Sequence, residues 1–391
     1  MKLLFLLSEF SGLEMIISKG IWKPMGVPTI YRIIERTNKK NNLKIIITSK
    51  KKLGDLVIKG FKNKITFIKK SGFLKPLVFF SNILKIYILL KKEKIDIVYV
   101  DRANLAYAGI LARFFKVKVI LRLMGIYPDM LEIKKRNNVS SYLQRFFYLS
   151  PFSYVICTED GSPGQWWLKN HLKKKVRNKL LLGGYDHFQV RKIKKISFNG
   201  TLNILFVSRL EKWKGCLEFL DAAIKILKND KKNFFFTIVG KGNLENYIIQ
   251  KIKSNNVEKN ISIIKNIDNK KIFKLYNHSH VYVSLNKLGN LSNSNIEALS
   301  FGKCCIFLKS DPSRKVDIST DKIIPNDCVL RVSRKKTADD LVKKLNVLQR
   351  NPKNISTYEK KISSFFKKKF LTWDERLDIE EKIINAVFKG E

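Results

Sequence analysis

The chain has 391 residues, 45% of them hydrophobic, which is too long for one ordinary core and too apolar for a disordered protein. Lysine and arginine total 77 against 33 aspartates and glutamates, so the formal net charge is +44. This excess favours polyanionic partners such as nucleic acid, an anionic membrane or phosphorylated small molecules, although a biased composition explains much of it.

The cysteines and the apolar runs indicate the cellular location of the protein. The five cysteines have neither the paired spacing of a zinc site nor the density of a secreted disulfide framework, which favours a reducing cytoplasm. The opening MKLLFLLSEF has a short apolar core without a small-residue cleavage site after it, and it predicts a buried strand rather than a signal peptide. No apolar run reaches the roughly 18 to 20 residues that cross a bilayer. We therefore expect a cytoplasmic protein, and peripheral contact with the cytoplasmic face of an anionic membrane stays open.

The first half of the chain alternates between short apolar runs and amphipathic segments. Such alternation predicts parallel strands joined by crossover helices that cover both faces of a sheet. In chain order the expected elements are a strand over 2–7, a helix over 29–39, a strand over 44–48, a helix over 77–92, a strand over 95–100, a helix over 103–115, and strands over 117–123, 154–158 and 179–182.

The segment 76–92, PLVFFSNILKIYILLKK, allows two interpretations. Its broad apolar face and its terminal lysines would suit a helix that lies on an acidic membrane surface. A core helix of the first domain explains the same apolar face, and we favour this second interpretation. The neighbouring Lys69, Lys70 and Lys75 keep the membrane alternative open.

A basic connector separates the two halves of the chain. Residues 187–200, HFQVRKIKKISFNG, interrupt the periodicity and end in glycine, so we place a domain boundary between 195 and 196. The alternation then restarts, which predicts a second domain over 196–369. Its expected elements are strands over 202–207, 234–239, 261–264, 281–285 and 304–308, and helices after Gly215, over 243–253 and 270–278, near Ser294 and over 338–348.

Two stretches of the second half carry charge or glycine directly after a strand. Arg209 and Lys214 lie in VSRLEKWKG, where an arginine fork and a lysine point charge could clamp a diphosphate. Gly240 and Gly242 in VGKGN would let the backbone approach a ligand closely. Neither stretch is specific alone, because surface cations and ordinary turn glycines give the same patterns.

The helix expected near Ser294 would direct its unpaired N–H groups at a ligand beyond the sheet. Glu297 lies in its first turn, and two roles are open for this residue. Ser294 and Glu297 have the spacing of a capping box, in which the glutamate only satisfies a backbone N–H group. Alternatively, the Glu297 carboxylate accepts hydrogen bonds from sugar or ribose hydroxyls.

The segments VSRLEKWKG, TIVGKGNLENYI, YNHSHVYVSL and NIEALSFGKCCI resemble, in order and spacing, the donor domain of glycosyltransferase family 4. The resemblance is specific from about Leu202 to Leu308 and weaker in the first half. It implies the GT-B fold, an α/β architecture in which two Rossmann-like domains face a central cleft. Residues 1–195 would be the acceptor domain and 196–369 the donor domain. The end of the chain, about 370–391, is similar to the closing helix that packs back on the first domain in such enzymes.

The resemblance also implies roles for single residues on the donor side. Arg209 and Lys214 match the positions that hold the donor diphosphate, and Glu297 matches the later glutamate of the family's paired-glutamate motif, which commonly binds the ribose. Gly289, in the polar loop LGNLSNSN, replaces the earlier glutamate of that motif. Sugar contacts are then expected from three polar residues nearby, Asn290, Asn293 and Ser294.

On the acceptor side the family often has a histidine before the glycine of an HG element, where this chain has Met124 before Gly125. The resemblance therefore leaves the acceptor-activating residue open. We expect it close to that glycine, with Arg122, Tyr127 and Asp129 as the candidates.

These observations together predict a glycosyltransferase of the hexosyltransferase type. It would move a sugar from a UDP- or GDP-linked donor to a glycan or lipid-linked acceptor in surface polysaccharide synthesis. Retention of configuration is expected, with no metal ion and no cofactor beyond the nucleotide sugar. Two alternatives stay open: a sugar-nucleotide epimerase on the same architecture, and a non-enzymatic binder of nucleic acid or another polyanion. Specific nucleic-acid recognition is not expected, because no signature of it occurs.

Overall fold

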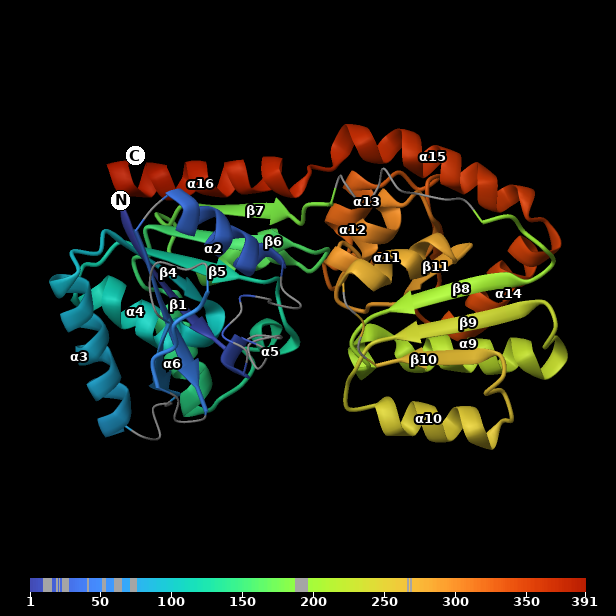
Figure 1. Cartoon of the computed structure of the whole chain (residues 1–391), viewed down its shortest axis with the longest axis horizontal. Helices are drawn as coiled ribbons and strands as arrows, with labels where there is room; N and C mark the ends of the chain where they lie inside the picture. Colours follow the sequence, from blue (N-terminus) through green and yellow to red (C-terminus); the bar gives the residue numbers. More distant parts are fainter. Residues whose placement is uncertain are drawn as a thin grey trace. The chain divides into compact units, whose positions relative to one another are not determined.

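The computed structural model describes residues 1–9, 16–18, 20, 22, 28–40, 42–50, 54–59, 65–70, 76–186, 196–265, 267 and 269–391. It divides into two compact units, each built on one sheet (Figure 1). Unit 1 consists of Met1–Thr158, Gly164–Leu181 and Arg376–Glu391, and unit 2 of Glu159–Pro163 and Leu182–Glu375. The boundary predicted between 195 and 196 touches residues 187–195, which lie outside the described part. None of the described helices has the length and hydropathy needed to span a bilayer.

Unit 1 contains a seven-stranded sheet in the order β3-β2-β1-β4-β5-β6-β7. The pairings from β3 through β6 are parallel. Most of each of β1, β4 and β5 is buried, since parallel strands are covered on both faces and therefore read as continuous apolar runs. The strands are β1 (Lys2–Ser8), β2 (Asn42–Ser49), β3 (Ile65–Lys69), β4 (Ile97–Asp101), β5 (Val119–Leu123), β6 (Tyr154–Glu159) and β7 (Asn178–Leu182).

Helices cover both faces of this sheet. Alternate strand residues point to opposite sides: Leu4 and Val98 share one core with α3, α4 and α6, whereas Phe5 and Tyr99 share another with α2 and α16. The helices are α2 (Pro28–Lys40), α3 (Pro76–Lys92), the 3-10 turn η1 (Arg102–Asn104), α4 (Leu105–Phe114), α5 (Pro128–Leu131), α6 (Val139–Tyr148), α7 (Gly164–His171) and α16 (Trp373–Lys389), of which unit 1 takes the part from Arg376 onward.

Unit 2 contains a six-stranded, entirely parallel sheet in the order β10-β9-β8-β11-β12-β13. Its strands are β8 (Leu202–Val207), β9 (Phe234–Val239), β10 (Ile261–Ile264), β11 (Val281–Ser284), β12 (Cys304–Leu308) and β13 (Leu330–Val332). Its helices are η2 (Lys212–Lys214), α9 (Cys216–Asn229), α10 (Glu245–Ser254), α11 (Asn269–Asn277), α12 (Asn293–Ser300), α13 (Ile318–Ile323), α14 (Thr337–Arg350) and α15 (Lys353–Lys369).

The order of the strands in unit 2 reverses direction next to β8. The chain runs outward from β8 to β9 and β10, then returns so that β11 pairs with the other side of β8, with Tyr282 opposite Leu205. The loops that leave the carboxyl ends of β8 and β11 therefore diverge from neighbouring strands. Ligands of doubly wound sheets bind at such a switch point. This topology singles out the loops after β8 and β11 as the place to look for a site.

Arg122, which we predicted on the acceptor side, is instead part of the interior of unit 1. Its side chain on β5 is fully buried, and Nη2 donates to Thr158 Oγ1 at 2.9 Å. Its Nε lies 3.6 Å from Glu380 Oε1 on α16, and Arg376 Nη1 lies 2.6 Å from the other oxygen of the same carboxylate. Tyr99 also donates its hydroxyl hydrogen to Glu380. The Arg122 side chain thus attaches the C-terminal helix to the sheet and has no exposed surface to offer an acceptor.

The two guanidinium groups decide the charge state of Glu380. Burial alone would raise the pKa of this carboxyl group, but Arg122 and Arg376 outweigh that effect and hold the pKa below its ordinary value. The group is therefore an ionised carboxylate inside the protein, stable only because both cations are beside it.

Replacing Glu380 with glutamine should lower the free energy of unfolding by about 3–5 kcal/mol, because two buried guanidinium groups lose their counter-charge. Urea unfolding followed by circular dichroism measures the change. Glu132→Gln is the matched control, since Glu132 forms an exposed ion pair with Arg136 at 3.0 Å and its loss should change stability little. Equal stability of the two variants would contradict the structural role of Glu380.

Candidate functional site

The loop after β8 gathers two cations around one indole ring. The guanidinium carbon of Arg209 lies 5.0 Å from the centre of the Trp213 ring, and Lys214 Nζ lies 4.1 Å from it. Glu211 fixes the arrangement, because it accepts a hydrogen bond from Trp213 Nε1 and its Oε1 lies 3.0 Å from Arg209 Nη1. The structure therefore brings the two predicted diphosphate ligands together at the carboxyl end of a central strand.

Gly240 and Gly242 hold this loop in place from the side of β9. A Cβ atom at Gly240 would lie 1.8 Å from the Ser208 carbonyl oxygen, and one at Gly242 would lie 2.2 Å from the Leu210 carbonyl oxygen. No side chain fits into either space. We predicted that these two glycines let the backbone approach a donor. In the structure they instead pack against the backbone of the residues before and after Arg209, and so position its side chain.

The loop after β11 packs on the other side of the same turn. Lys287 N donates to the Trp213 carbonyl oxygen at 2.9 Å, and Gly215, with a φ of 76°, lies so close that a Cβ there would meet the Leu285 carbonyl oxygen at 2.3 Å. Glycine adopts this left-handed conformation without strain. The Arg209–Lys214 turn and the loop that leads to α12 are consequently packed against each other at the switch point.

Helix α12 begins at Asn293 rather than at Ser294, and the predicted capping box is not formed. Ser292 is the N-cap residue and its side chain makes no capping hydrogen bond. The hydroxyl of Ser294 lies 3.2 Å from that of Ser292. Glu297 Oε2 instead accepts a hydrogen bond from the Tyr276 hydroxyl at 3.1 Å. With Ser292 as the N-cap, Ser294 lies inside the helix and Glu297 is not at the third helical position that a capping box requires.

Asn290 is fully buried, and its hydrogen-bonding groups are used inside unit 2. Its backbone N donates to Asp317 Oδ1 at 2.6 Å, and its Nδ2 donates to Asp317 Oδ2 at 2.7 Å. Its Oδ1 accepts a hydrogen bond from Ser284 at 3.1 Å. The sugar contact predicted for Asn290 is thus not provided by this conformation, and the residue fixes the loop before α12.

Asp317 is a central residue of this region that the sequence did not reveal. Besides Asn290, its carboxylate accepts hydrogen bonds from Thr320 Oγ1 at 2.6 Å and Arg334 Nη2 at 3.2 Å. Its backbone N donates to the Gly161 carbonyl oxygen at 2.7 Å. Burial raises the pKa of Asp317 to about 6, although each of these donors opposes the rise. The carboxylate thus joins its own segment to Asn290 and Arg334, and the backbone N of Asp317 adds Gly161.

The segment Glu159–Pro163 explains why glycine stands where the resemblance predicts a glutamate. A Cβ at Gly289 would lie 2.4 Å from the Asp160 carbonyl oxygen and 2.5 Å from Ser162 N. The neighbouring Leu291 N donates to the same Asp160 carbonyl at 3.0 Å. A glutamate at 289 would have to displace this segment, so the substitution goes together with a changed backbone around it.

Lys214 and Asp160 influence each other electrostatically. Burial lowers the pKa of Lys214 to about 8, and the adjacent Arg209 lowers it further, against the opposing charges of Asp160 and Glu211. Burial also raises the pKa of Asp160, which Ser162 and the Lys214 charge counteract. A lysine whose pKa is reduced beside another cation is poised to gain from a bound anion.

In unit 1, Tyr127 and Asp129 lie beside Arg102, which the sequence analysis missed. Arg102 forms an ion pair with Asp129, its Nε donates to the Tyr148 hydroxyl at 3.1 Å, and its guanidinium carbon lies 5.4 Å from the centre of the Tyr127 ring. Gly125 precedes this group in a left-handed conformation with a φ of 99°. Arg122 lies apart from Tyr127 and Asp129, in the buried network with Glu380.

No group of three or more potential metal-binding side chains occurs in the parts of the chain that the structure describes. At the switch point of unit 2 the cations Arg209 and Lys214 lie beside the carboxylates Glu211 and Asp160.

Known proteins share both the sequence pattern of this region and the fold of the chain. Residues 189–362 match the family model described as "Glycosyl transferases group 1". Unit 2 thus matches the group 1 glycosyl transferases. An uncharacterized glycosyltransferase of Methanocaldococcus jannaschii is 30% identical over 118 residues, which are 30% of this chain and 29% of the relative, so the match spans less than a third of that protein.

Solved structures resemble the chain over nearly its whole length. Sucrose-phosphate synthase from Thermosynechococcus elongatus has a TM-score of 0.73 at 13% identity, covering 99% of this chain and 100% of that one. Anabaena HepE in complex with UDP has a TM-score of 0.69 at 13% identity, covering 98% and 100%, and HepE has also been solved with UDP-glucose. The likeness confirms the predicted GT-B fold class. Together with the group 1 glycosyl transferase match it supports a transferase, while membership of family 4 stays a prediction.

The carboxyl group of Asp317 should make the protein less stable as the pH rises from about 4 to about 6. Its pKa is near 6 in the folded protein against 3.8 ordinarily, so folding favours the protonated form, and this advantage is lost as the pH rises through the folded value. Over that range Asp317→Asn, which does not titrate, should gain up to about 3 kcal/mol of unfolding free energy relative to the unsubstituted protein. Urea unfolding at several pH values tests this. Parallel pH profiles of the two proteins would contradict it.

Proposed function

We propose that this protein transfers a sugar from a nucleoside diphosphate sugar bound at the switch point of unit 2. The observation that carries the proposal is the pair of cations, Arg209 and Lys214, around Trp213 at the carboxyl end of β8, packed against the loop that leads to α12. The match to group 1 glycosyl transferases and the UDP and UDP-glucose complexes of a structural relative support a UDP-linked donor. A GDP-linked donor is the alternative.

Breaking the bond between the anomeric carbon and the diphosphate places negative charge on the leaving group. Fixed positive groups that stabilise this developing charge lower the barrier most effectively. Arg209 supplies paired N–H donors and Lys214 a point charge, and the N-terminal N–H groups of α12 add a partial positive charge. These groups provide the neutralisation that a divalent cation provides elsewhere, which is why we propose a metal-independent reaction.

The donor's ribose and sugar would be held by polar side chains of α12. Asn293 and Ser294 lie in its first turn, with Ser294 next to the Ser292 hydroxyl, and they are proposed to contact the sugar. Glu297 accepts a hydrogen bond from Tyr276 through one oxygen, and we assign its carboxylate to the ribose hydroxyls. Asn290, Gly240 and Gly242 act indirectly, because they position the loops that carry these ligands.

The acceptor is proposed to bind unit 1, at the carboxyl ends of β4 and β5, where Tyr127, Asp129 and Arg102 lie together. A glycan or lipid-linked acceptor in surface polysaccharide synthesis and retention of configuration complete the proposal, on the strength of the family resemblance. We place the reaction in the cytoplasm, in keeping with five buried cysteines that form no disulfide.

Changing Arg209 or Lys214 to alanine should slow turnover about 100-fold or more, since each variant removes a charge from the leaving-group site. The assay is release of the nucleotide from the nucleotide sugar that raises the melting temperature most, with EDTA in the buffer. Lys212→Ala is the matched control, because Lys212 is an exposed lysine of the same turn. Rates close to that of the control in both variants would reject the assignment.

The value of kcat/KM for the donor should decrease at alkaline pH, with an apparent pKa near 8. Lys214 has a pKa of about 8 in the free protein and binds the diphosphate only when protonated, so activity is retained below this pH and lost above it. In Lys214→Arg this decrease in kcat/KM should occur at a higher pH, because a guanidinium group stays protonated. A decrease at the same pH in Lys214→Arg would contradict the role of Lys214.

A further inference from the structure

Helix α3 has two apolar faces, of which only one is used by the core. Its inner face is buried in unit 1 through Phe79, Ile83 and Ile86, as a core helix requires. Its outer face carries four large hydrophobic side chains with relative exposures between 54% and 86%, namely Leu77, Phe80, Leu84 and Ile88. Their spacing of three and four residues places them on one stripe of the helix. A continuous stripe of this kind indicates a binding surface rather than scattered exposure.

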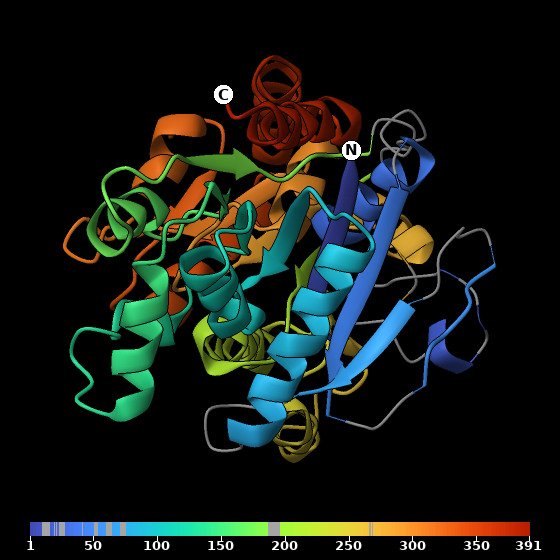
Figure 2. The ribbon, with the colours of Figure 1, turned by 90° about the vertical axis from the view of Figure 1, so that its left-hand side faces the viewer.

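The neighbouring helices extend this surface. Helix α6 has its own exposed stripe, with Val139, Tyr142 and Phe146 between 43% and 74% exposed, and Phe114 at the end of α4 is 65% exposed. Figure 2 shows α3, α4 and α6 next to one another on the near side of unit 1. Among the described residues of unit 2, the large hydrophobic side chains of comparable exposure lie singly on separate elements: Tyr247, Ile318, Val347 and Leu371.

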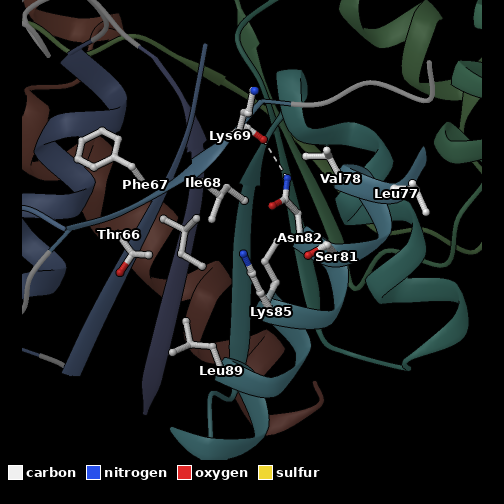
Figure 3. Close-up of a pocket in the computed structure, with 12 residues that line it drawn as sticks. Thr66, Phe67, Ile68, Lys69, Leu77, Val78, Ser81, Asn82, Lys85 and Leu89 are labelled. Atoms are coloured by element: carbon white, nitrogen blue, oxygen red, sulfur yellow. Dashed lines mark hydrogen bonds between the residues drawn. The ribbon is translucent and has the colours of Figure 1, made fainter. Parts of the chain in front are cut away.

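A groove of about 670 Å³ between α3 and the edge strand β3 widens the apolar surface (Figure 3). Leu77, Val78 and Leu89 line it from α3, and Phe67 and Ile68 line it from β3. Leu77 belongs to both the groove and the exposed stripe, so the two apolar regions are continuous. Asn82 also lines the groove, and its Nδ2 donates to the Lys69 carbonyl oxygen at 2.9 Å.

The charged side chains on these three helices have a single sign. Helices α3, α4 and α6 contain no aspartate or glutamate, and their cations are Lys85, Lys91, Lys92, Arg113 and Arg145. Two of these cations lie over exposed rings, with Arg113 4.1 Å from the centre of the Phe146 ring and Arg145 4.1 Å from that of Tyr142. On the opposite face of the sheet the part of α16 that belongs to unit 1 carries three acidic residues, Asp378, Glu380 and Glu381.

We infer that the outer face of α3, α4 and α6 docks the protein on an anionic phospholipid bilayer. Apolar side chains beside lysine and arginine are what an interfacial helix needs, because the first enter the acyl boundary while the second contact anionic head groups. Helix α3 has 17 residues and an apolar inner face packed in the core, so it lies along the membrane and does not cross it. The inference concerns unit 1 and does not depend on the proposed donor site in unit 2.

Flotation with lipid vesicles tests this docking surface. The full chain should bind vesicles of phosphatidylcholine mixed with phosphatidylglycerol and should bind pure phosphatidylcholine much more weakly. The double variant Phe80→Glu/Leu84→Glu should bind the mixed vesicles at least about tenfold more weakly, because both side chains are exposed and leave the fold intact. Val347→Glu, an exposed apolar position of unit 2, is the control and should bind like the unsubstituted protein.

Two results of this experiment would overturn the inference. One is the absence of binding to the mixed vesicles. The other is equal binding of the double variant and the control, which would mean that net charge alone attracts the protein. A dimer that dissociates in the double variant, with no vesicle binding, would identify the surface as an interface between two copies of the chain instead.

A label on the stripe reports insertion directly and does not rely on a disruptive variant. All five native cysteines are buried, so Leu84→Cys can be labelled selectively with a polarity-sensitive dye. Its emission should shift to shorter wavelength on mixed vesicles, whereas a label at Val347→Cys should not change. An unshifted emission at Leu84→Cys would contradict docking through α3.

Melting-temperature shifts with UDP separate this inference from the proposed function. The Phe80→Glu/Leu84→Glu variant should keep the UDP shift of the unsubstituted protein, because the stripe is remote in sequence from Arg209 and Lys214 and belongs to the other unit. Loss of vesicle binding with a preserved UDP shift supports the docking surface. Vesicle binding without any UDP shift would leave the docking surface standing and count against the donor site alone.

Discussion

The candidate site of unit 2 depends on backbone contacts that only glycine permits. The Arg209–Lys214 turn lies between the loops after β9 and β11, and on both sides the neighbouring backbone occupies the space of a side chain, at Gly240 and at Gly215. Since the contacts are between main chains, the turn cannot be moved without moving two strand ends. The cations therefore project from a rigid support, which is what preorganised electrostatic stabilisation requires.

Two buried carboxyl groups show how neighbours decide the state of an ionisable side chain. Glu380 in unit 1 lies between two guanidinium groups, and its pKa is lowered in spite of burial. Asp317 in unit 2 has a single arginine at 3.2 Å and otherwise neutral donors, and its pKa rises to about 6. Both carboxyl groups are buried, yet Glu380 is ionised whereas Asp317 titrates near pH 6. Each of the two carboxyl groups joins segments that are far apart in the sequence, so local sequence patterns could not predict these contacts.

The sequence predicted the parts of the fold that local patterns determine. Alternating apolar runs and amphipathic segments gave most of the strands, for example 234–239, which matches β9, because a strand buried on both faces is apolar throughout. The edge strand β3 and the three-residue β13 were not predicted, since edge strands are shorter and more polar. The helix α15 was missed for a similar reason: its lysine-rich sequence hides a narrow buried stripe.

The site was predictable only where a motif is contiguous in the chain. Arg209 and Lys214 share one turn, so their proximity followed from the sequence. Asp317 and Asp160 lie far from the loop they hold, and nothing in their own neighbourhood indicates that contact. Arg122 misled for the converse reason, because a cation that follows an apolar run resembles a ligand unless its partner Glu380 is known. The capping-box prediction at Ser294 failed because Ser294 lies inside the helix, which begins at Asn293 with Ser292 as its N-cap.

The net charge of +44 indicates little until the cations are placed on the fold. A lysine in an exposed helix beside leucine and phenylalanine is suited to a surface that is both apolar and anionic, as α3 illustrates with Lys85 and its stripe. A lysine held over an indole at the end of a parallel strand is suited to a small, multiply charged ligand, as Lys214 illustrates. The two environments differ in burial and in their neighbours, not in the number of charges. Composition therefore favours anions in general, and the apolar groups beside each cation determine which kind of anion it can bind.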